Sequence, residues 1–140
     1  MSANPQHFLD TNILLYSISR APDEAAKSAA AIALLDKDGG ALSVQVLQEF
    51  YVQATRATRA DRVPHDIAAG LINTWTRFAV QDITLAVMKN ALSIKAAHGF
   101  SYWDSAIIAA ARALGCRELY SEDMAHGREV EGIVIINPFH

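Results

Sequence analysis

Short apolar runs separated by turn residues recur along the chain and predict buried strands. They lie at residues 8–9, 41–43, 117–120 and 133–136, and a fifth candidate covers residues 78–83. The run at 133–136 contains only Ile and Val without polar alternation, which is typical of a strand covered on both faces.

Helix signals fill the intervals between these runs. The predicted helices cover residues 13–19, 25–35, 44 to about 59, 65 or 66 to 75, and 85 to about 98. One more predicted helix, the last in the chain, has a capping-box spacing at residues 101–104 and an Ala- and Ile-rich run at 105–114. Ser43 and Thr84 are placed to cap helices, and Gly99 and Gly115 are placed to end them. Short strands separated by helices indicate an α/β sandwich around a mainly parallel sheet. In such sheets, functional residues gather beyond the carboxyl ends of the strands.

Four acidic residues fall at this edge of the predicted sheet, although they are far apart in the sequence. Asp10 follows the first strand, Glu49 lies one to two turns into the helix after the second, Asp104 lies in the first turn of a late helix, and Asp123 follows the strand at 117–120. Carboxylates forced together repel unless protons or cations neutralise them. Clustered oxygen ligands of this type suit Mg²⁺ or Mn²⁺. We therefore expect the four carboxylates to approach a common point and share an ion.

Each acid also has a local explanation that requires no metal. Asp10 suits a turn, Glu49 a solvated helix face and Asp123 a loop, while Asp104 and Ser101 have the spacing of a helix capping box. Apolar residues flank both Asp10 and Asp104, and acids beside a core usually have partners. That context favours a shared site over four separate explanations.

Composition and charge agree with a shared acidic site. With 140 residues, 51% of them hydrophobic, the chain has the size of one domain and can bury a core. Its formal charge of -3 argues against a simple basic nucleic-acid module, but without the four acids the charge would be +1. The acidity therefore belongs largely to the candidate site itself.

Cysteine usage and targeting signals bear on where the protein acts. Cys116 is the only cysteine, which excludes an internal disulfide and a cysteine-based zinc site within one chain. The first seven residues lack the charged and apolar regions of a signal peptide, and the apolar runs are too short for a membrane span. We therefore expect a soluble cytoplasmic protein without a membrane partner.

Four segments, in order, resemble the motifs of PIN-domain ribonucleases. They are FLDTNIL at residues 8–14, LQEFY at 47–51, YWDSAI at 102–107 and LYSEDM at 119–124. The subgroup to which the chain is most similar is the VapC toxins of bacterial toxin–antitoxin pairs, over residues 8–137. The resemblance implies a single PIN-like domain at residues 1–140, built as a three-layer α/β/α sandwich with a mainly parallel central sheet.

Carried over position by position, the resemblance implies catalytic and metal-binding roles for Asp10, Glu49, Asp104 and Asp123. Asn12 and Ser121 match polar positions that support the site, with Ser121 in place of the more usual Thr. Glu122 is the alternative fourth ligand, but the offset of Asp123 from Ser121 matches the family pattern better. Ala125 stands where some members carry another acid, which argues against a strongly held second metal.

The resemblance also implies an activity and partners. The activity is that of a Mg²⁺-dependent endoribonuclease, with Mn²⁺ able to substitute, acting as the toxin of a toxin–antitoxin pair. The implied partners are transfer or ribosomal RNA as substrate, a cognate antitoxin, and a second copy in a homodimer. The alternative is a non-catalytic PIN-like module for RNA binding or assembly.

Three groups of side chains each allow two interpretations. Arg56, Arg59 and Arg62 suit either phosphate binding or a solvated helix face. Tyr102 and Trp103 could stack on an unpaired base, although aromatic residues at the start of an apolar helix more often pack in the core. An apolar set suits either an antitoxin groove or the interior: Leu14, Leu15, Tyr16, Ile18, Leu34 and Leu35.

Overall fold

Parallel strand pairs form the centre of the computed structural model, which describes residues 4–140. Over that range the sheet has six strands in the order β3-β2-β1-β4-β6-β5. The strands are β1 (His7–Leu9), β2 (Gly40–Ser43), β3 (Ala79–Gln81), β4 (Glu118–Tyr120), β5 (Glu129–Val130) and β6 (Ile133–Ile136). All neighbouring pairs are parallel except β5 and β6, which confirms the predicted, mainly parallel sheet.

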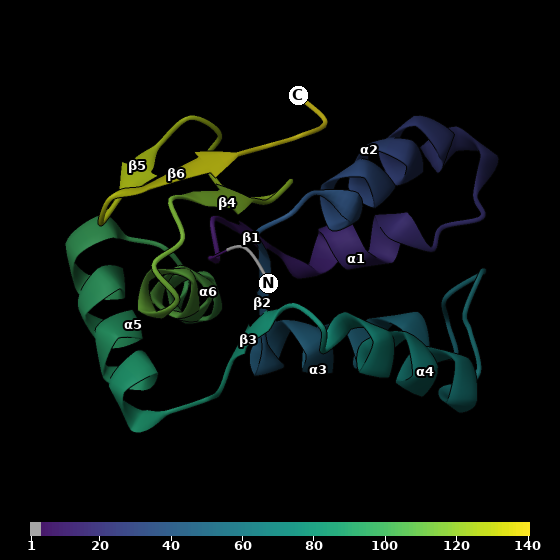
Figure 1. Cartoon of the computed structure of the whole chain (residues 1–140), viewed down its shortest axis with the longest axis horizontal. Helices are drawn as coiled ribbons and strands as arrows, with labels where there is room; N and C mark the ends of the chain where they lie inside the picture. The colour runs from purple at the N-terminus through teal and green to yellow at the C-terminus, as the bar shows by residue number, and fades with distance from the viewer. Residues whose placement is uncertain (1–3) are drawn as a thin grey trace.

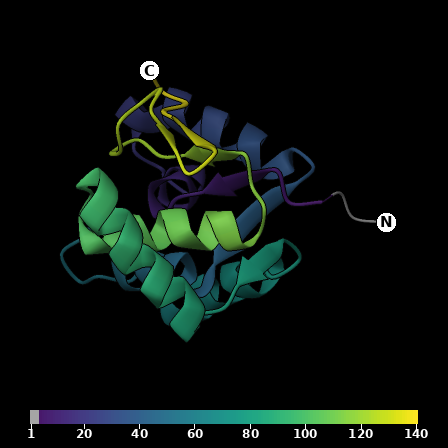
Figure 2. The same cartoon turned by 90° about the vertical axis from the view of Figure 1, so that its left-hand side faces the viewer.

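Helices lie on both sides of the sheet, which confirms the predicted α/β sandwich. They are α1 (Thr11–Ser17), α2 (Ala25–Asp36), α3 (Val44–Ala54), α4 (His65–Trp75), α5 (Leu85–His98) and α6 (Tyr102–Ala113), with a 3-10 turn at Pro22–Glu24. Figure 1 shows α5 and α6 on one side and α1 to α4 on the other. Helix α6 packs on the sheet, and α5 crosses the outer side of α6 (Figure 2).

Hydroxyl side chains cap the starts of three helices. In each case a hydroxyl accepts a backbone N–H from the first turn, and the capping residues are Ser43, Thr84 and Ser101. Gly99 adopts a left-handed conformation with φ 79° and ends α5 as predicted. Ser101 is the cap of α6, which begins at Tyr102, and this confirms the capping-box spacing of Ser101 and Asp104 in the sequence.

Two helix boundaries differ from the prediction for local reasons. Helix α1 begins at Thr11 instead of residue 13, because the Asp10 carboxylate accepts the Thr11 N–H and caps the helix. Helix α3 ends at Ala54, well before residue 59, where the Thr55 hydroxyl donates back to the carbonyl of Tyr51. The three arginines predicted on the end of this helix therefore lie in the loop that follows it.

Strand β6 is not covered on both faces, so that prediction was wrong. Ile133 and Ile135 are buried, but Val134 is 38% exposed and Ile136 is half-buried. The reason is its position next to the edge strand, where only one face of the sheet is covered. The edge strand β5 was not predicted, since two residues carry no recognisable strand pattern.

A tightly packed core supports the strand-to-helix junction that carries Asp10. Phe8 and Leu9 before it, and Ile13 and Leu14 after it, are all fully buried. The junction is therefore fixed from both ends, which leaves Asp10 little freedom to move. Within residues 4–140, each helix is too short or too polar to cross a membrane.

Candidate metal centre

One cavity at the carboxyl edge of the sheet brings together the four acids singled out in the sequence. It has a volume of about 330 Å³ and is lined by Asp10, Thr11, Asn12, Leu15, Glu49, Gln53, Asp104, Ile107 and Asp123. Asp10 follows β1 and Asp123 follows the neighbouring parallel strand β4, which puts their loops at the same edge. Helices α3 and α6 supply Glu49 and Asp104.

Asp10 is the most buried of the four acids, with 7% of its surface exposed. One carboxylate oxygen accepts the backbone N–H of Thr11 and the other accepts the hydroxyl of Ser121, both at 2.7 Å. The pKa of Asp10 is raised to about 6 overall: burial raises it most, the hydrogen bonds from Ser121 and Thr11 lower it in part, and the charges of Glu49 and Asp104 raise it. A buried carboxylate facing other carboxylates is a place where a cation is stabilised.

Thr11 connects two of the acids, and the sequence analysis did not single it out. Its N–H bonds Asp10, and its hydroxyl donates to a carboxylate oxygen of Glu49 at 2.9 Å. The signal that could have found it is its place directly after the capping acid, in the first turn of α1.

Asp104 and Asp123 form the more exposed part of the cavity. Asp104 is half-buried; burial raises its pKa, the Ser101 hydroxyl lowers it and the charge of Asp123 raises it, so that its pKa is raised overall. Asp123 is exposed and accepts the side-chain amide of Asn12 at 3.3 Å. The Asn12 side chain also accepts the N–H of Glu122 at 3.4 Å, so it ties the loop after β4 to helix α1.

Glu122 does not line the cavity and is engaged elsewhere. It accepts the hydroxyl of Tyr16 at 2.6 Å and pairs with the ammonium of Lys27 at 2.5 Å. Burial alone would raise the pKa of Glu122, but the hydrogen bonds from Lys27 and Tyr16 and the Lys27 charge hold its pKa below the usual range. Of the two adjacent acids, Asp123 is the one that faces the cavity.

The donor set fits Mg²⁺ by its chemistry, although the four carboxylates do not meet at one point. Among residues 4–140, no three His, Cys, Asp or Glu side chains lie close enough together to hold a metal ion. The prediction that the four carboxylates approach a common point is therefore wrong for the arrangement in this structure. Mg²⁺ usually keeps several waters and binds through one or two carboxylates, and the cavity of about 330 Å³ has room for a hydrated ion. The residues present fit such an ion, with Asp10 as its buried anion.

Positive charge lies outside the acidic cavity, whose lining in the described chain includes neither Lys nor Arg. Arg59 pairs with Asp61 at 3.0 Å, and Arg62 donates to the carbonyl of Ala57. Two of the three arginines considered for phosphate binding are thus held within their own loop.

The apolar and aromatic candidates divide between interior and surface. Leu14 and Leu35 are buried, which assigns them to the interior. The other members of that set are partly buried at the margin of the core: Leu15, Tyr16, Ile18 and Leu34. Tyr102 also packs against the core, but Trp103 is 63% exposed, so the expectation that it packs inside was wrong.

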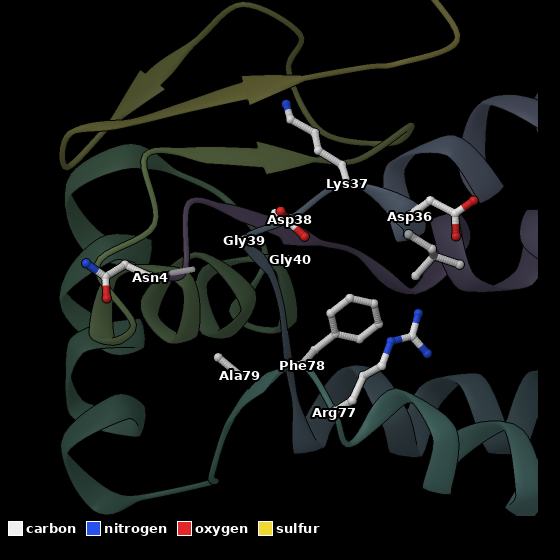
Figure 3. A pocket seen from close by; sticks show the side chains of 10 residues that line it. Asn4, Asp36, Lys37, Asp38, Gly39, Gly40, Arg77, Phe78 and Ala79 are labelled. Atoms are coloured by element: carbon white, nitrogen blue, oxygen red, sulfur yellow. The ribbon is translucent and has the colours of Figure 1, made fainter. Parts of the chain in front are cut away.

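A larger cavity lies at the opposite edge of the sheet. It measures about 680 Å³ and opens where β2 and β3 begin. Figure 3 shows two basic side chains, Lys37 and Arg77, and two acidic ones, Asp36 and Asp38, around the Phe78 ring. Opposite charges in equal number select neither an anion nor a cation, so the acidic cavity is the stronger candidate site.

Comparison with known proteins assigns the family. A family model described as the PIN domain matches residues 7–128. The chain belongs to the PIN-domain family. The match confirms the family resemblance drawn from the four sequence motifs. A comparison of this PIN domain with curated protein sequences gave no match.

Solved structures share the fold of this PIN domain. A toxin–antitoxin complex from Klebsiella pneumoniae has a TM-score of 0.70 at 17% identity, over 95% of this chain and 98% of that chain. VapC20 from Mycobacterium tuberculosis, described as a sarcin–ricin loop cleaving toxin, has a TM-score of 0.64 at 21% identity. The match covers 81% of this chain and 87% of that chain. FitAcB from Neisseria gonorrhoeae has a TM-score of 0.63 at 17% identity, over 96% of this chain and 99% of that chain. At these identities the likeness establishes the fold alone.

Proposed function

We propose that this PIN domain is a Mg²⁺-dependent endoribonuclease that hydrolyses RNA phosphodiester bonds, with Mn²⁺ able to replace Mg²⁺. The observation that carries the proposal is the cavity lined by four carboxylates, in which the pKa of buried Asp10 is raised to about 6. Such a cluster destabilises the fold unless a cation or a proton neutralises it. Nuclease activity is also what the PIN-domain resemblance implies for these four positions.

The contacts around the cavity suggest a role for each residue. Asp10, Glu49, Asp104 and Asp123 would hold the hydrated ion, one or two of them directly and the others through its waters. When bound, Mg²⁺ supplies Lewis-acid stabilisation of charge on the phosphate and lowers the pKa of water. Ser121 favours the ionised form of Asp10 by donating to it, Thr11 fixes Glu49, and Asn12 fixes Asp123, so these three are positioning residues.

The proposal extends to partners and location. We infer that the domain acts in the cytoplasm as the toxin of a toxin–antitoxin pair, on transfer or ribosomal RNA, as a homodimer inhibited by a cognate antitoxin. Support comes from neighbours of the same fold, one described as a toxin–antitoxin complex and another as a sarcin–ricin loop cleaving toxin. The buried, free thiol of Cys116 suits a reducing compartment.

A non-catalytic PIN-like module for RNA binding or assembly is the second candidate. The observation that favours it is that no three acids of residues 4–140 lie within joint ligand distance of one ion. Such a module would bind RNA without cutting it and would not depend on Mg²⁺.

Metal removal separates the two candidates. We expect the native chain to cleave RNA in Mg²⁺ or Mn²⁺, to lose cleavage in excess EDTA, and to regain it when Mg²⁺ is restored. Because water is the attacking group, the products should carry a 5′-phosphate and a 3′-hydroxyl, which end mapping detects. Cleavage that persists in EDTA, or 2′,3′-cyclic phosphate ends, would contradict the metal-dependent mechanism, and binding without any cleavage would favour the module.

Adjacent acids in the loop after β4 provide a matched pair of variants. We expect Asp123→Asn to lower the initial cleavage rate at least about tenfold, because Asp123 faces the cavity. Glu122→Gln should lower the rate less, because Glu122 is committed to Lys27 and Tyr16. Initial rates across a Mg²⁺ titration measure both effects. A larger loss in Glu122→Gln would make Glu122 the fourth ligand.

A further inference from the structure

Trp103 is an exposed aromatic side chain next to the acidic cavity. It is 63% exposed, whereas Trp75, the other tryptophan, is 4% exposed and packs on Phe50. Trp103 precedes Asp104 in the first turn of α6 and contacts Tyr102 in a T-shaped arrangement with 5.0 Å between ring centroids. An exposed indole beside a candidate catalytic acid offers a surface on which a flat ligand can stack.

Two hollows meet at Trp103. The first has a volume of about 320 Å³ and lies between Trp103 and helix α3. The second, of about 290 Å³, lies toward the start of α5 and shares Gln45, Gln48 and Trp103 with the first. The first hollow also shares Glu49 and Gln53 with the acidic cavity. The first hollow and the candidate metal centre therefore lie next to each other.

One face of helix α3 lines the first hollow with a mixture of apolar groups and side-chain amides. Gln45, Gln48, Glu49, Val52 and Gln53 line it at the spacing of a single helix face. Gln45 donates to the backbone carbonyl of Trp103 at 3.3 Å. The side-chain amides of Gln48 and Gln53 make no hydrogen bond to any other residue of the described range 4–140. Such amides can both donate to and accept from the edge of a nucleobase.

We infer that Trp103 and the glutamine face of α3 form a subsite for one unpaired nucleobase, adjacent to the phosphate that the acidic cavity would cut. This inference rests on the proposed function and deepens it. Stacking on Trp103 supplies affinity with little dependence on base identity, and the amides of Gln48 and Gln53 supply base preference. The substrate is therefore single-stranded or looped RNA, because a base held in a duplex is not free to enter the hollow.

A second copy of the chain is the competing occupant of this surface. Ile83, Leu85 and Met88, at or near the second hollow, are also exposed, and exposed apolar groups suit a protein interface. Two observations favour the nucleobase instead. Three glutamines with side-chain amides lie along the first hollow, and the hollow shares Glu49 and Gln53 with the acidic cavity.

The test measures binding in a chain that cannot cut its ligand. The full chain carrying Asp10→Asn is titrated with a fluorescently labelled, single-stranded oligoribonucleotide in Mg²⁺, and affinity is read from anisotropy. Unlabelled oligonucleotide should quench the fluorescence of Trp103, while buried Trp75 gives a constant background. In this background, Trp103→Ala should weaken binding about 5- to 100-fold. Trp103→Phe should keep most of the affinity and lose the quenching.

The matched control is Leu85→Ala, since Leu85 is 66% exposed but lines neither hollow. It should leave RNA affinity unchanged. In a series of oligonucleotides, each nucleotide in turn is replaced by an abasic residue. At one position the chain with Trp103 and the Trp103→Ala chain should bind the abasic oligonucleotide with equal affinity. That position identifies the stacked base.

The outcomes separate this inference from the proposed function. Unchanged RNA affinity in Trp103→Ala would overturn the subsite. If Trp103→Ala and Leu85→Ala both keep their RNA affinity but change the oligomeric state seen by sedimentation, the surface belongs to a second copy of the chain. Cleavage by the native chain together with unchanged binding in Trp103→Ala overturns the subsite alone. Binding that depends on Trp103, without cleavage by the native chain, overturns the nuclease alone.

Discussion

Asp10→Asn is expected to lower the rate of RNA cleavage more than about 100-fold at saturating Mg²⁺. Loss of an outer partner of a metal ligand typically costs about 10- to 100-fold, so loss of the buried ligand itself should cost more. Asp10 is also the acid on which other contacts converge, because Ser121 and Thr11 both donate to it. Asn has the same size and keeps an oxygen, so the substitution removes mainly the charge.

The control for this experiment is Asp36→Asn, an exposed aspartate at the opposite edge of the sheet, which should cleave at the native rate. Asp104→Asn should lose activity in the same way as Asp10→Asn, since both acids line the cavity. Thermal melting of each variant shows whether it remains folded. Undiminished cleavage in Asp10→Asn and Asp104→Asn would contradict the proposed catalytic centre.

The sheet and most helices could be predicted because their signals are local. The Ser43 and Thr84 hydroxyls cap the helices that directly follow them, and Gly99 supplies the left-handed residue that ends α5. The exposure of Val134 could not be predicted in this way. A run of β-branched residues reports strand propensity, whereas the covering of each face depends on where the strand lies in the sheet.

The candidate site could be predicted only as far as topology determines it. Parallel strands end at one edge, so the acids after β1 and β4 had to come near each other. The hydrogen bond from Thr11 to Glu49 and the ion pair of Glu122 with Lys27 join helices and loops that are distant in sequence. No local pattern specifies such contacts. The same holds for Trp103, whose exposure depends on how closely α3 and α5 approach α6.

In the absence of metal, Asp10→Asn is expected to raise the free energy of unfolding at about pH 7.5. Burial raises the pKa of Asp10 from its ordinary 3.8 to about 6, so its ionised form is less stable in the folded chain than in the unfolded one. At about 1.4 kcal/mol per pKa unit, the cost at neutral pH is at most about 3 kcal/mol. Asn avoids this cost and can keep both contacts, because the Ser121 hydroxyl can accept as well as donate.

The sign of the pH dependence follows from the raised pKa. Protonated Asp10 favours the folded state, so its contribution is fully present below about pH 3.8 and is lost as the pH rises through about 6. The variant and the native chain should therefore differ little at about pH 4, and the variant should be more stable by up to about 3 kcal/mol at about pH 7.5. Taking the difference between the two chains removes the common titration of other shifted groups, such as His7 and Glu122, whose pKa values are lowered.

Mg²⁺ should reverse this order of stability. An ion that binds only the folded native chain adds about 2.7 kcal/mol at 100 times its dissociation constant, and Asp10→Asn should gain little. Thermal melts in EDTA and in Mg²⁺ measure both effects, with Asp36→Asn as the charge-matched control that should respond to Mg²⁺ as the native chain does.

A lower melting temperature for Asp10→Asn than for the native chain in EDTA would mean that the ionised carboxylate stabilises the fold. Equal Mg²⁺ shifts in the native chain and Asp10→Asn would place the ion outside this cavity, because the buried anion proposed to hold it would then make no difference.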